Sequence, residues 1–238
     1  MRILINLSLT LLLCAIAPSL LAVESPNRIH AKYDVLKGNI KIATITETYT
    51  RTPGGYHIES VSRAVGLLAV FKPEIITITS EGTLTTHGLR PTTFIQKRKL
   101  DGHRNARADF DWNAHLITLT DRAGTRTLPL ATATQDRLSV MYQFIFSDLS
   151  NIPLLNLKIS NGSKVDDYSY RITPNQNVKV PLGIFPAIYL TTPRQGKEKN
   201  QTEIWLATEH ANFPYKMTIT DSDGDALTQE LTQFNFEP

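Results

Sequence analysis

The chain has 238 residues, with 25 basic and 22 acidic side chains and a formal net charge of +3. A charge so close to balance gives no argument for nucleic-acid binding, and the length suits one all-β domain. The single cysteine, Cys14, excludes a disulfide framework within the chain and a metal site built from several thiolates.

The N-terminus predicts an export signal. Arg2 precedes an uncharged, mostly apolar run that is shorter than the roughly 18 residues of a membrane-spanning helix, and small residues follow it. We expect residues 1–22 to be a signal peptide cleaved after Ala22, with cleavage after Ser19 as the alternative. Residues 23–238 would then be the mature protein, located in the periplasm.

Cys14 has an alternative role as the acceptor of a lipid anchor. Lipoprotein processing favours small residues just before the cysteine, whereas three leucines precede Cys14 and the apolar run continues beyond it. The pattern therefore favours an ordinary signal peptide. After Ala22 no apolar run of about 18 residues recurs, so we expect no transmembrane segment.

Strand-forming segments dominate the rest of the chain. From Ile29 onward apolar and polar residues alternate with a period of two, and β-branched residues recur. Turn signals separate the segments, and Asp101-Gly102 is the strongest hairpin signal. The predicted strands are residues 31–36, 40–46, 56–61, 74–80, 92–98, 106–112, 116–120, 154–159, 164–172, 185–192, 202–206, 214–220 and 226–234.

One helix interrupts the strands. Thr132 and Gln135 fit a capping box, in which the threonine hydroxyl accepts from an early helix amide and the glutamine reaches back. Asp136 suits the positive end of the helix, and Pro153 prevents its continuation. The apolar stripe at three- and four-residue steps comprises Leu138, Met141, Tyr142, Ile145 and Leu149. We therefore predict a helix over residues 134–147.

These elements predict an all-β fold with that one helix. An antiparallel sheet of roughly thirteen strands should curl or close to protect its edges, as a β-spiral or an open barrel does. The chain contains no Pro-, Gly- or Ser-rich linker and no βαβ alternation. We therefore expect residues 23–238 to form a single β-rich domain.

Several short motifs follow one another in a characteristic order. They are Tyr33 with Gly38-Asn39-Ile40, Gly66 to Pro73, Ser80-Glu81-Gly82, Gly88 to Pro91, Phe110-Asp111-Trp112, Leu128-Pro129, Gln135 to Ser139, Val180 to Phe185, Ile204 to Ala207, and Asp221 to Gly224. In this order the motifs resemble the bacterial exported family called domain of unknown function 3108, from about Tyr33 to Gly224. The resemblance implies a β-rich fold and an exported location, and it transfers no catalytic residues.

The residues offer no compact catalytic or metal-binding motif. There is no G-x-S-x-G, and no two of the six histidines lie within ten residues of each other: His30, His57, His87, His103, His115 and His210. The acidic segment 221–225 lacks the spacing of an EF-hand and fits an Asp-Gly turn between strands. We expect no cofactor, no metal and no catalytic residue. The alternative is a small periplasmic hydrolase whose His, Ser and Asp residues are assembled from distant segments.

A basic hairpin tip surrounds the Asp101-Gly102 turn. Lys97, Arg98 and Lys99 precede the turn, and Arg104 and Arg107 follow it. Such a tip can bind anionic headgroups, lipopolysaccharide or an acidic partner, in a salt-dependent way. The alternative is a solvated hairpin whose charges block aggregation.

The candidate binding residues lie elsewhere. Gly66, Leu67 and Phe71 belong to an apolar segment that we expect to form a short helix or lid over one mouth of the curled sheet, with Phe71 inside, where an apolar ligand can enter. The alternative for this segment is ordinary core closure.

The other predicted binding residues are Arg90, Trp112 and Trp205. We expect Arg90 to be partly buried and paired with Asp111 or Asp136, and the two tryptophans to lie in the core or at its rim. We predict non-catalytic binding or scaffolding, with a lipid, a glycolipid or an envelope protein as partner.

Overall fold

The computed structural model describes residues 26–149, 151–193 and 200–238. The predicted signal peptide, including Cys14, lies outside the described residues. Within the described segments, no helix has both the length and the apolar character that crossing a membrane requires.

The described segments form fifteen strands, two short α-helices and three 3-10 turns. The strands are β1 (Arg28–Lys37), β2 (Ile40–Thr52), β3 (Gly55–Ala64), β4 (Ile75–Thr85), β5 (Gly88–Arg98), β6 (Ala106–Asp111), β7 (Leu116–Asp121), β8 (Gly124–Pro129), β9 (Gln135–Asp136), β10 (Leu154–Ser160), β11 (Val165–Val180), β12 (Gly183–Thr191), β13 (Gln201–Ala207), β14 (Phe213–Thr220) and β15 (Ala226–Glu237). The helices are α1 (Gly66–Phe71) and α2 (Ser139–Gln143), and the 3-10 turns are η1 (Gly102–Arg104), η2 (Phe144–Phe146) and η3 (Thr208–His210).

The predicted all-β class is confirmed, and each of the thirteen predicted strands is present. The prediction missed β8 and β9. All six residues of β8 are exposed or only partly buried, so this edge strand has no alternation of apolar and polar residues to reveal it. β9 is a two-residue bridge that exists only because β10 lies beside it.

All fifteen strands belong to one sheet, in the order β8-β7-β6-β5-β4-β3-β2-β1-β15-β14-β13-β12-β11-β10-β9. Every pairing is antiparallel except the short parallel bridge between β9 and β10. The two ends of the described chain meet in the middle of the sheet, where β1 pairs with β15 through contacts such as Ile29 with Phe236. Neighbouring strands are therefore consecutive in sequence on either side of this central pair.

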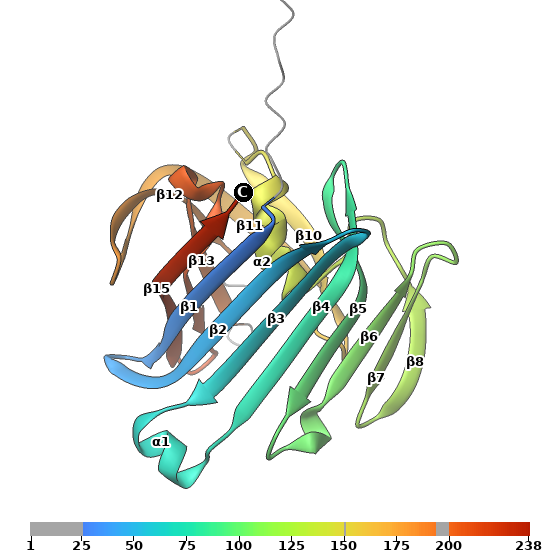
Figure 1. Cartoon of the computed structure of the whole chain (residues 1–238), viewed down its shortest axis with the longest axis horizontal. Helices are drawn as coiled ribbons and strands as arrows, with labels where there is room; N and C mark the ends of the chain where they lie inside the picture. The colour runs from blue at the N-terminus through green and yellow to red at the C-terminus, as the bar shows by residue number, and fades with distance from the viewer. Residues whose placement is uncertain (1–25, 150, 194–199) are drawn as a thin grey trace, which may run out of the picture.

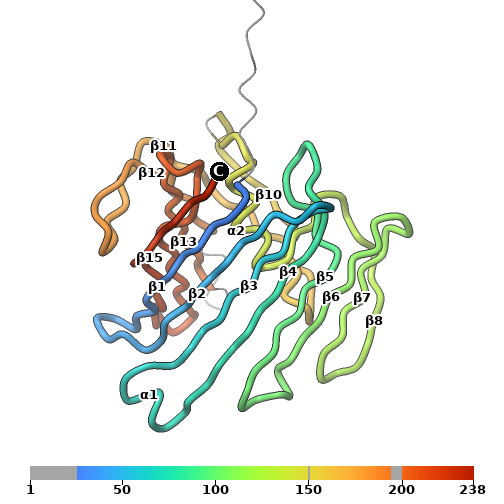
Figure 2. The backbone as a smooth tube through the Cα atoms, in the orientation of Figure 1, coloured from blue at the N-terminus to red at the C-terminus, as the bar shows by residue number. Residues whose placement is uncertain are grey.

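The sheet curls so that its second half faces the inner side of its first half. Figure 1 shows β2 to β4 in front, β10, β11 and β13 behind them, and α2 between the two layers. The backbone tube shows the same arrangement (Figure 2). Contacts of α2 with both β5 and β14 agree with this placement.

Aromatic and aliphatic side chains of α2 and η2 join the two halves of the sheet. The Tyr142 ring stacks on Tyr49 of β2 and meets Phe213 of β14 edge-on, each with 5.6 Å between ring centroids. Val140 and Phe144 pack into a second buried cluster with residues of β10 to β13. The helix thus fills the concave side of the sheet and contributes to both hydrophobic clusters.

The helix is shorter than predicted, and its capping differs. α2 begins at Ser139 and continues only as the single turn η2, rather than spanning residues 134–147. The predicted capping box does not form, because the side chain of Gln135 donates to the Leu89 carbonyl on β5, at 2.8 Å. The apolar stripe was predicted correctly, since Leu138, Tyr142, Ile145 and Leu149 are all buried.

The buried carboxylate of Asp136 caps the helix instead. It accepts hydrogen bonds from the amides of Leu138 and Ser139, at 2.8 and 2.7 Å, and from the Ser80 hydroxyl of β4, at 2.6 Å. The Ser139 hydroxyl accepts in return from the Asp136 amide, at 3.0 Å. Asp136 therefore ties the start of α2 directly to the inner face of the sheet.

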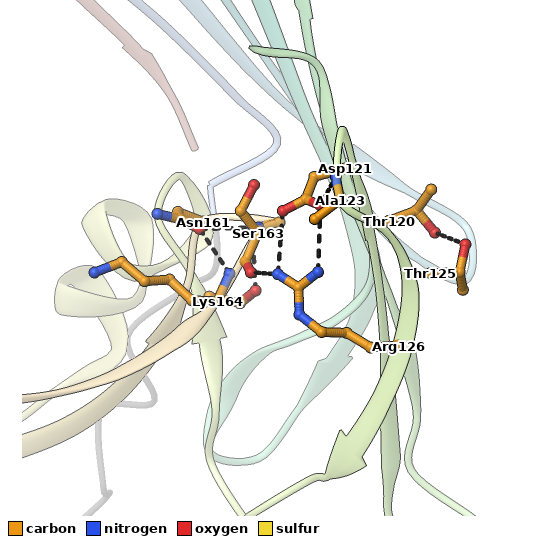
Figure 3. Close-up of polar contacts among 10 residues, drawn as sticks. Thr120, Asp121, Ala123, Thr125, Arg126, Asn161, Ser163 and Lys164 are labelled. Carbon is orange, nitrogen blue, oxygen red and sulfur yellow. Dashed lines mark hydrogen bonds and ion pairs between the residues drawn. The ribbon is translucent and has the colours of Figure 1, made fainter. Parts of the chain in front are cut away.

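The free edges of the sheet meet through side chains and turns rather than through strand pairing. Arg126 of the edge strand β8 donates to both carboxylate oxygens of Asp121 and to the carbonyl of Ser163 in the β10–β11 turn (Figure 3). Gly162 of that turn has φ +86° and lies so close to the β5–β6 pair that an added Cβ would be 2.9 Å from the Ala106 Cβ. Only glycine fits this left-handed, crowded position.

Replacing this glycine should loosen the closure. Gly162→Ala places alanine at a positive φ and also forces its Cβ against Ala106, whereas Gly224→Ala has a similar φ, +89°, with nothing within 4 Å. We expect Gly224→Ala to lower the free energy of unfolding by about 1 kcal/mol and Gly162→Ala to lower it by at least about 2 kcal/mol. Urea denaturation measures both, and equal losses would contradict the close packing of the turn.

Replacing Asp136 with alanine should lower the free energy of unfolding more than replacing it with asparagine, which removes only the negative charge. Asp136→Ala leaves two amides and the Ser80 hydroxyl without their acceptor, so we expect a loss of about 3 kcal/mol or more in the free energy of unfolding. Asp136→Asn keeps an oxygen for the two amides and should lose markedly less. Thermal and urea unfolding of the two variants test this, and an equal effect of both substitutions would refute it.

Candidate ligand-binding site

An apolar cavity of about 390 Å³ lies between α2 and the inner faces of the two halves of the sheet. Branched and thioether side chains form a large part of its wall, among them Ile45, Ile78, Met141, Met217 and Ile219, and tyrosines and polar side chains complete it. Its volume falls within the range of small-molecule sites. The curl of the sheet creates the space, and α2 fills only part of it.

The wall also contains charged groups, namely Glu47, Asp166, Arg137 and Lys216, and Glu47 is the buried carboxyl group among them. Glu47 of β2 is 7% exposed, and its two oxygens accept hydrogen bonds from the Ser60 hydroxyl, at 2.9 Å, and the Tyr142 hydroxyl, at 3.1 Å. Burial raises the pKa of Glu47 above its ordinary value, which these two hydrogen bonds partly offset. The carboxyl group therefore connects β2, β3 and α2 while facing the cavity.

A second cavity, of about 480 Å³, adjoins the first and is polar. Its lining includes four arginines from different elements, Arg98 of β5, Arg104 of η1, Arg122 of the β7–β8 turn, and Arg137. Its one carboxylate is that of Asp121, which Arg126 already binds. The bond from Arg126 is the main cause of the lowered pKa of Asp121. Positive charge therefore prevails in this cavity.

Arg137 and Asn161 line both cavities. The guanidinium group of Arg137 donates to the side-chain oxygen of Gln96, at 3.0 Å, and keeps accessible surface because it faces the cavities. Burial, and then the neighbouring Arg98, lower the pKa of Arg137. An arginine with a lowered pKa still carries its charge at neutral pH.

The residues predicted to bind ligand lie outside both cavities. Gly66, Leu67 and Phe71 form α1, which Figure 1 shows at one end of β3 and β4. The helix was predicted, but the expectation that Phe71 lies inside the sheet is wrong, since Phe71 is 83% exposed. The side chains of α2 occupy the interior instead, and the β3–β4 connection remains at the surface.

Arg90 and Trp112 contact each other rather than a cavity. The Arg90 guanidinium lies 4.8 Å from the centroid of the Trp112 ring, whose nitrogen donates to the Pro91 carbonyl at 2.6 Å. The predicted partly buried ion pair of Arg90 with Asp111 or Asp136 is wrong, because Arg90 is exposed and forms no ion pair with either carboxylate.

Trp205 packs at the edge of the apolar cavity wall. Its ring lies 4.9 Å from that of Tyr189, and the Lys216 ammonium lies 5.7 Å from its centroid. Lys216 itself lines the apolar cavity, whereas Trp205 does not.

The basic hairpin supplies part of the polar cavity, whereas none of the residues predicted to bind an apolar ligand lines the apolar cavity. Arg98 and Arg104 belong to the predicted basic hairpin, and the structure brings them to one cavity, whereas Arg107 pairs with Asp109. Glu47 had a recognisable signal, because it occupies an inward position between Ile45 and Tyr49 in an alternating strand. No signal in the sequence marked Arg137 as a cavity residue.

The fold and the cavities define a class, that of curled, incompletely closed β-sheet proteins with an interior helix and an internal cavity. The crystal structure of a β-barrel-like protein of domain of unknown function DUF1849 from Brucella abortus is similar in fold, with a TM-score of 0.59. The likeness covers 90% of this chain and 99% of that chain at 12% sequence identity.

The chain belongs to the family described as "Protein of unknown function (DUF3108)", which it matches over residues 29–232. This match confirms the family predicted from the ordered motifs. A comparison with curated proteins found no match.

The raised pKa of Glu47 predicts a pH-dependent stability. The folded protein holds this proton to higher pH than the unfolded chain does, so Glu47 lowers stability progressively as the pH rises from about 4.3, the ordinary value, to its raised pKa. Glu47→Gln removes this titration. We expect the variant to gain stability relative to the parent across that window, as measured by urea unfolding at several pH values. A difference between the two proteins that does not change with pH would contradict the assignment.

Proposed function

We propose that this protein binds an apolar or amphipathic small molecule, without transforming it, in the cavity beneath α2. The observation that carries the proposal is the apolar wall of that cavity, formed by side chains from both halves of the sheet and from α2. A cavity of this size, with a few convergent polar groups, is what ligand-binding sites have in common. A lipid or a glycolipid is the class of ligand that fits it.

The proposed place of action is the periplasm. The support for this location is the pattern of residues 1–22, with a basic start, an apolar run and a small residue at the expected cleavage point. A binding protein in that compartment would hold an envelope lipid away from water. The exposed apolar side chains of α1, including Leu67 and Phe71, support contact with an envelope partner as a further part of this role.

The geometry favours binding over the alternative of a hydrolase. A serine nucleophile needs a base within hydrogen-bond reach. Ser60 donates to Glu47 in the apolar cavity, but no histidine lines that cavity within the described residues. His103, Ser163 and Asp121 line the polar cavity together, but Arg126 binds both oxygens of the Asp121 carboxylate, and no hydrogen bond joins His103 to Ser163 or Asp121 in the described part of the chain.

Gentle purification followed by native mass spectrometry and solvent extraction tests the proposal. We expect a near-stoichiometric lipid or glycolipid with the parent protein. Ile78→Trp, which fills the apolar cavity, should reduce the bound amount about tenfold or more, because it removes the space that the ligand occupies.

Ile40→Trp is the matched control, since Ile40 is 70% exposed and lies outside the cavity. It should leave the bound amount unchanged. A parent protein without any bound molecule, or equal binding to the Ile78→Trp variant, would overturn the proposal.

A further inference from the structure

We infer that the ligand is an anionic amphiphile, with its apolar tail in the apolar cavity and an oxyanion headgroup, of the phosphate type, against Arg137 and Arg98 in the polar cavity. This inference rests on the proposed function and specifies the chemistry of its ligand.

The arrangement of the two cavities suits a molecule with two different ends. They share Arg137 and Asn161 in their walls, so one ligand can extend from one cavity into the other past these two side chains. The wall changes from isoleucine and methionine on one side to arginine on the other. A purely apolar ligand would make no contact with the arginines of the polar cavity, and a free anion would leave the apolar cavity empty.

The positive charges of the polar cavity are only partly compensated by carboxylates. Four guanidinium groups and one carboxylate line it, and that carboxylate, Asp121, already binds Arg126 in a bidentate pair. Arg98 and Arg104 form only long ion pairs with carboxylates. Glu74 lies 4.0 Å from Arg98 and Asp101 lies 4.0 Å from Arg104. An anion between these arginines would be bound by charge-assisted hydrogen bonds.

Arg98 and Arg137 each have guanidinium donors that form no hydrogen bond within the described residues. Within the described residues, the guanidinium of Arg137 makes one hydrogen bond, to Gln96, and no ion pair. The Nε atom of Arg98 is buried and has no hydrogen-bond partner in the described part of the chain. Both groups come from elements that hold their backbone in place, since Arg98 donates its amide to Asn105 and Arg137 donates its amide to Ser160. Guanidinium groups with free donors bind phosphate oxygens well because their geometry matches.

Arg126, in the same region, is an arginine whose hydrogen bonds hold the fold together. Its donors are engaged with Asp121 and with the Ser163 carbonyl, as Figure 3 shows. Arg122, four residues earlier in the same hairpin, is exposed, lines the polar cavity and makes no ion pair among the described residues. The contrast separates the arginine that closes the sheet from the arginines available to a ligand.

Calorimetric titration of the delipidated protein with three probes tests the inference. The probes are dodecyl phosphate, dodecanol and inorganic phosphate. We expect the parent to bind dodecyl phosphate about tenfold or more tightly than dodecanol, and inorganic phosphate more weakly than dodecyl phosphate. The preference for dodecyl phosphate over dodecanol should shrink as salt is added.

Variants locate the headgroup. Arg137→Gln should reduce the affinity for dodecyl phosphate about tenfold more than it changes the affinity for dodecanol. Arg122→Gln, at an exposed turn, provides a second test in a variant whose folding is not at risk, with a smaller reduction in the same direction. Arg51→Gln, an exposed arginine outside both cavities, is the matched control and should behave as the parent does.

The outcomes separate this inference from the proposed function. Equal affinity for dodecyl phosphate and dodecanol in the parent, or an undiminished preference in both cavity variants, would overturn the inference and leave apolar binding intact. Inorganic phosphate bound as tightly as dodecyl phosphate would overturn the amphiphile in favour of a free oxyanion. If neither dodecyl probe binds the parent, both the inference and the proposed function fail.

Discussion

The position of one buried carboxylate determines how the interior of this protein is organised. Asp136 is fully buried and satisfied by two amides at the start of α2 and by the Ser80 hydroxyl of β4. Burial raises its pKa, and these hydrogen bonds offset that rise in part. A buried carboxylate without such partners would be too costly to keep, so the chain after β8 has to enter the concave side at this point. That entry places α2 between the two halves of the sheet and Arg137 between the two cavities.

Side chains do not fill the interior of the sheet completely, and the remaining space forms one apolar and one polar cavity. α2 and η2 contribute Tyr142, Val140 and Phe144 to the two hydrophobic clusters, yet they leave an apolar cavity beside them. Glu47 and Asp166 are the acidic groups of that cavity, and the Glu47 carboxyl group accepts hydrogen bonds from Ser60 and Tyr142. The arginines of the neighbouring cavity have fewer hydrogen-bond partners than they have donors, so positive charge prevails there. This asymmetry is the physical basis for assigning a ligand with an apolar tail and an anionic head.

Local patterns explain which predictions succeeded. Alternating residues revealed thirteen strands because each of them has one face toward the interior, and the ordered motifs identified the family. β8 was not predicted because neither of its faces is buried. The predicted capping box does not form because the Gln135 side chain donates instead to the Leu89 carbonyl of β5, a contact that no local sequence pattern shows. Phe71 was expected inside because it is apolar, but six apolar residues at the end of a hairpin do not have to be buried when α2 already occupies the interior. The basic hairpin was visible in the sequence, whereas its association with Arg137 was not.

The sequence by itself determined the all-β class, most of the strands, the apolar stripe of α2 and the family, because these depend on residues close together in the chain. The size of the predicted sheet also indicated that it curls. Only the tertiary structure decided that Gly162 of the β10–β11 turn packs on the β5–β6 pair and that two cavities meet at Arg137. These features depend on contacts between segments far apart in sequence. Alternation within a strand shows which face is buried but not which distant side chain lies opposite it.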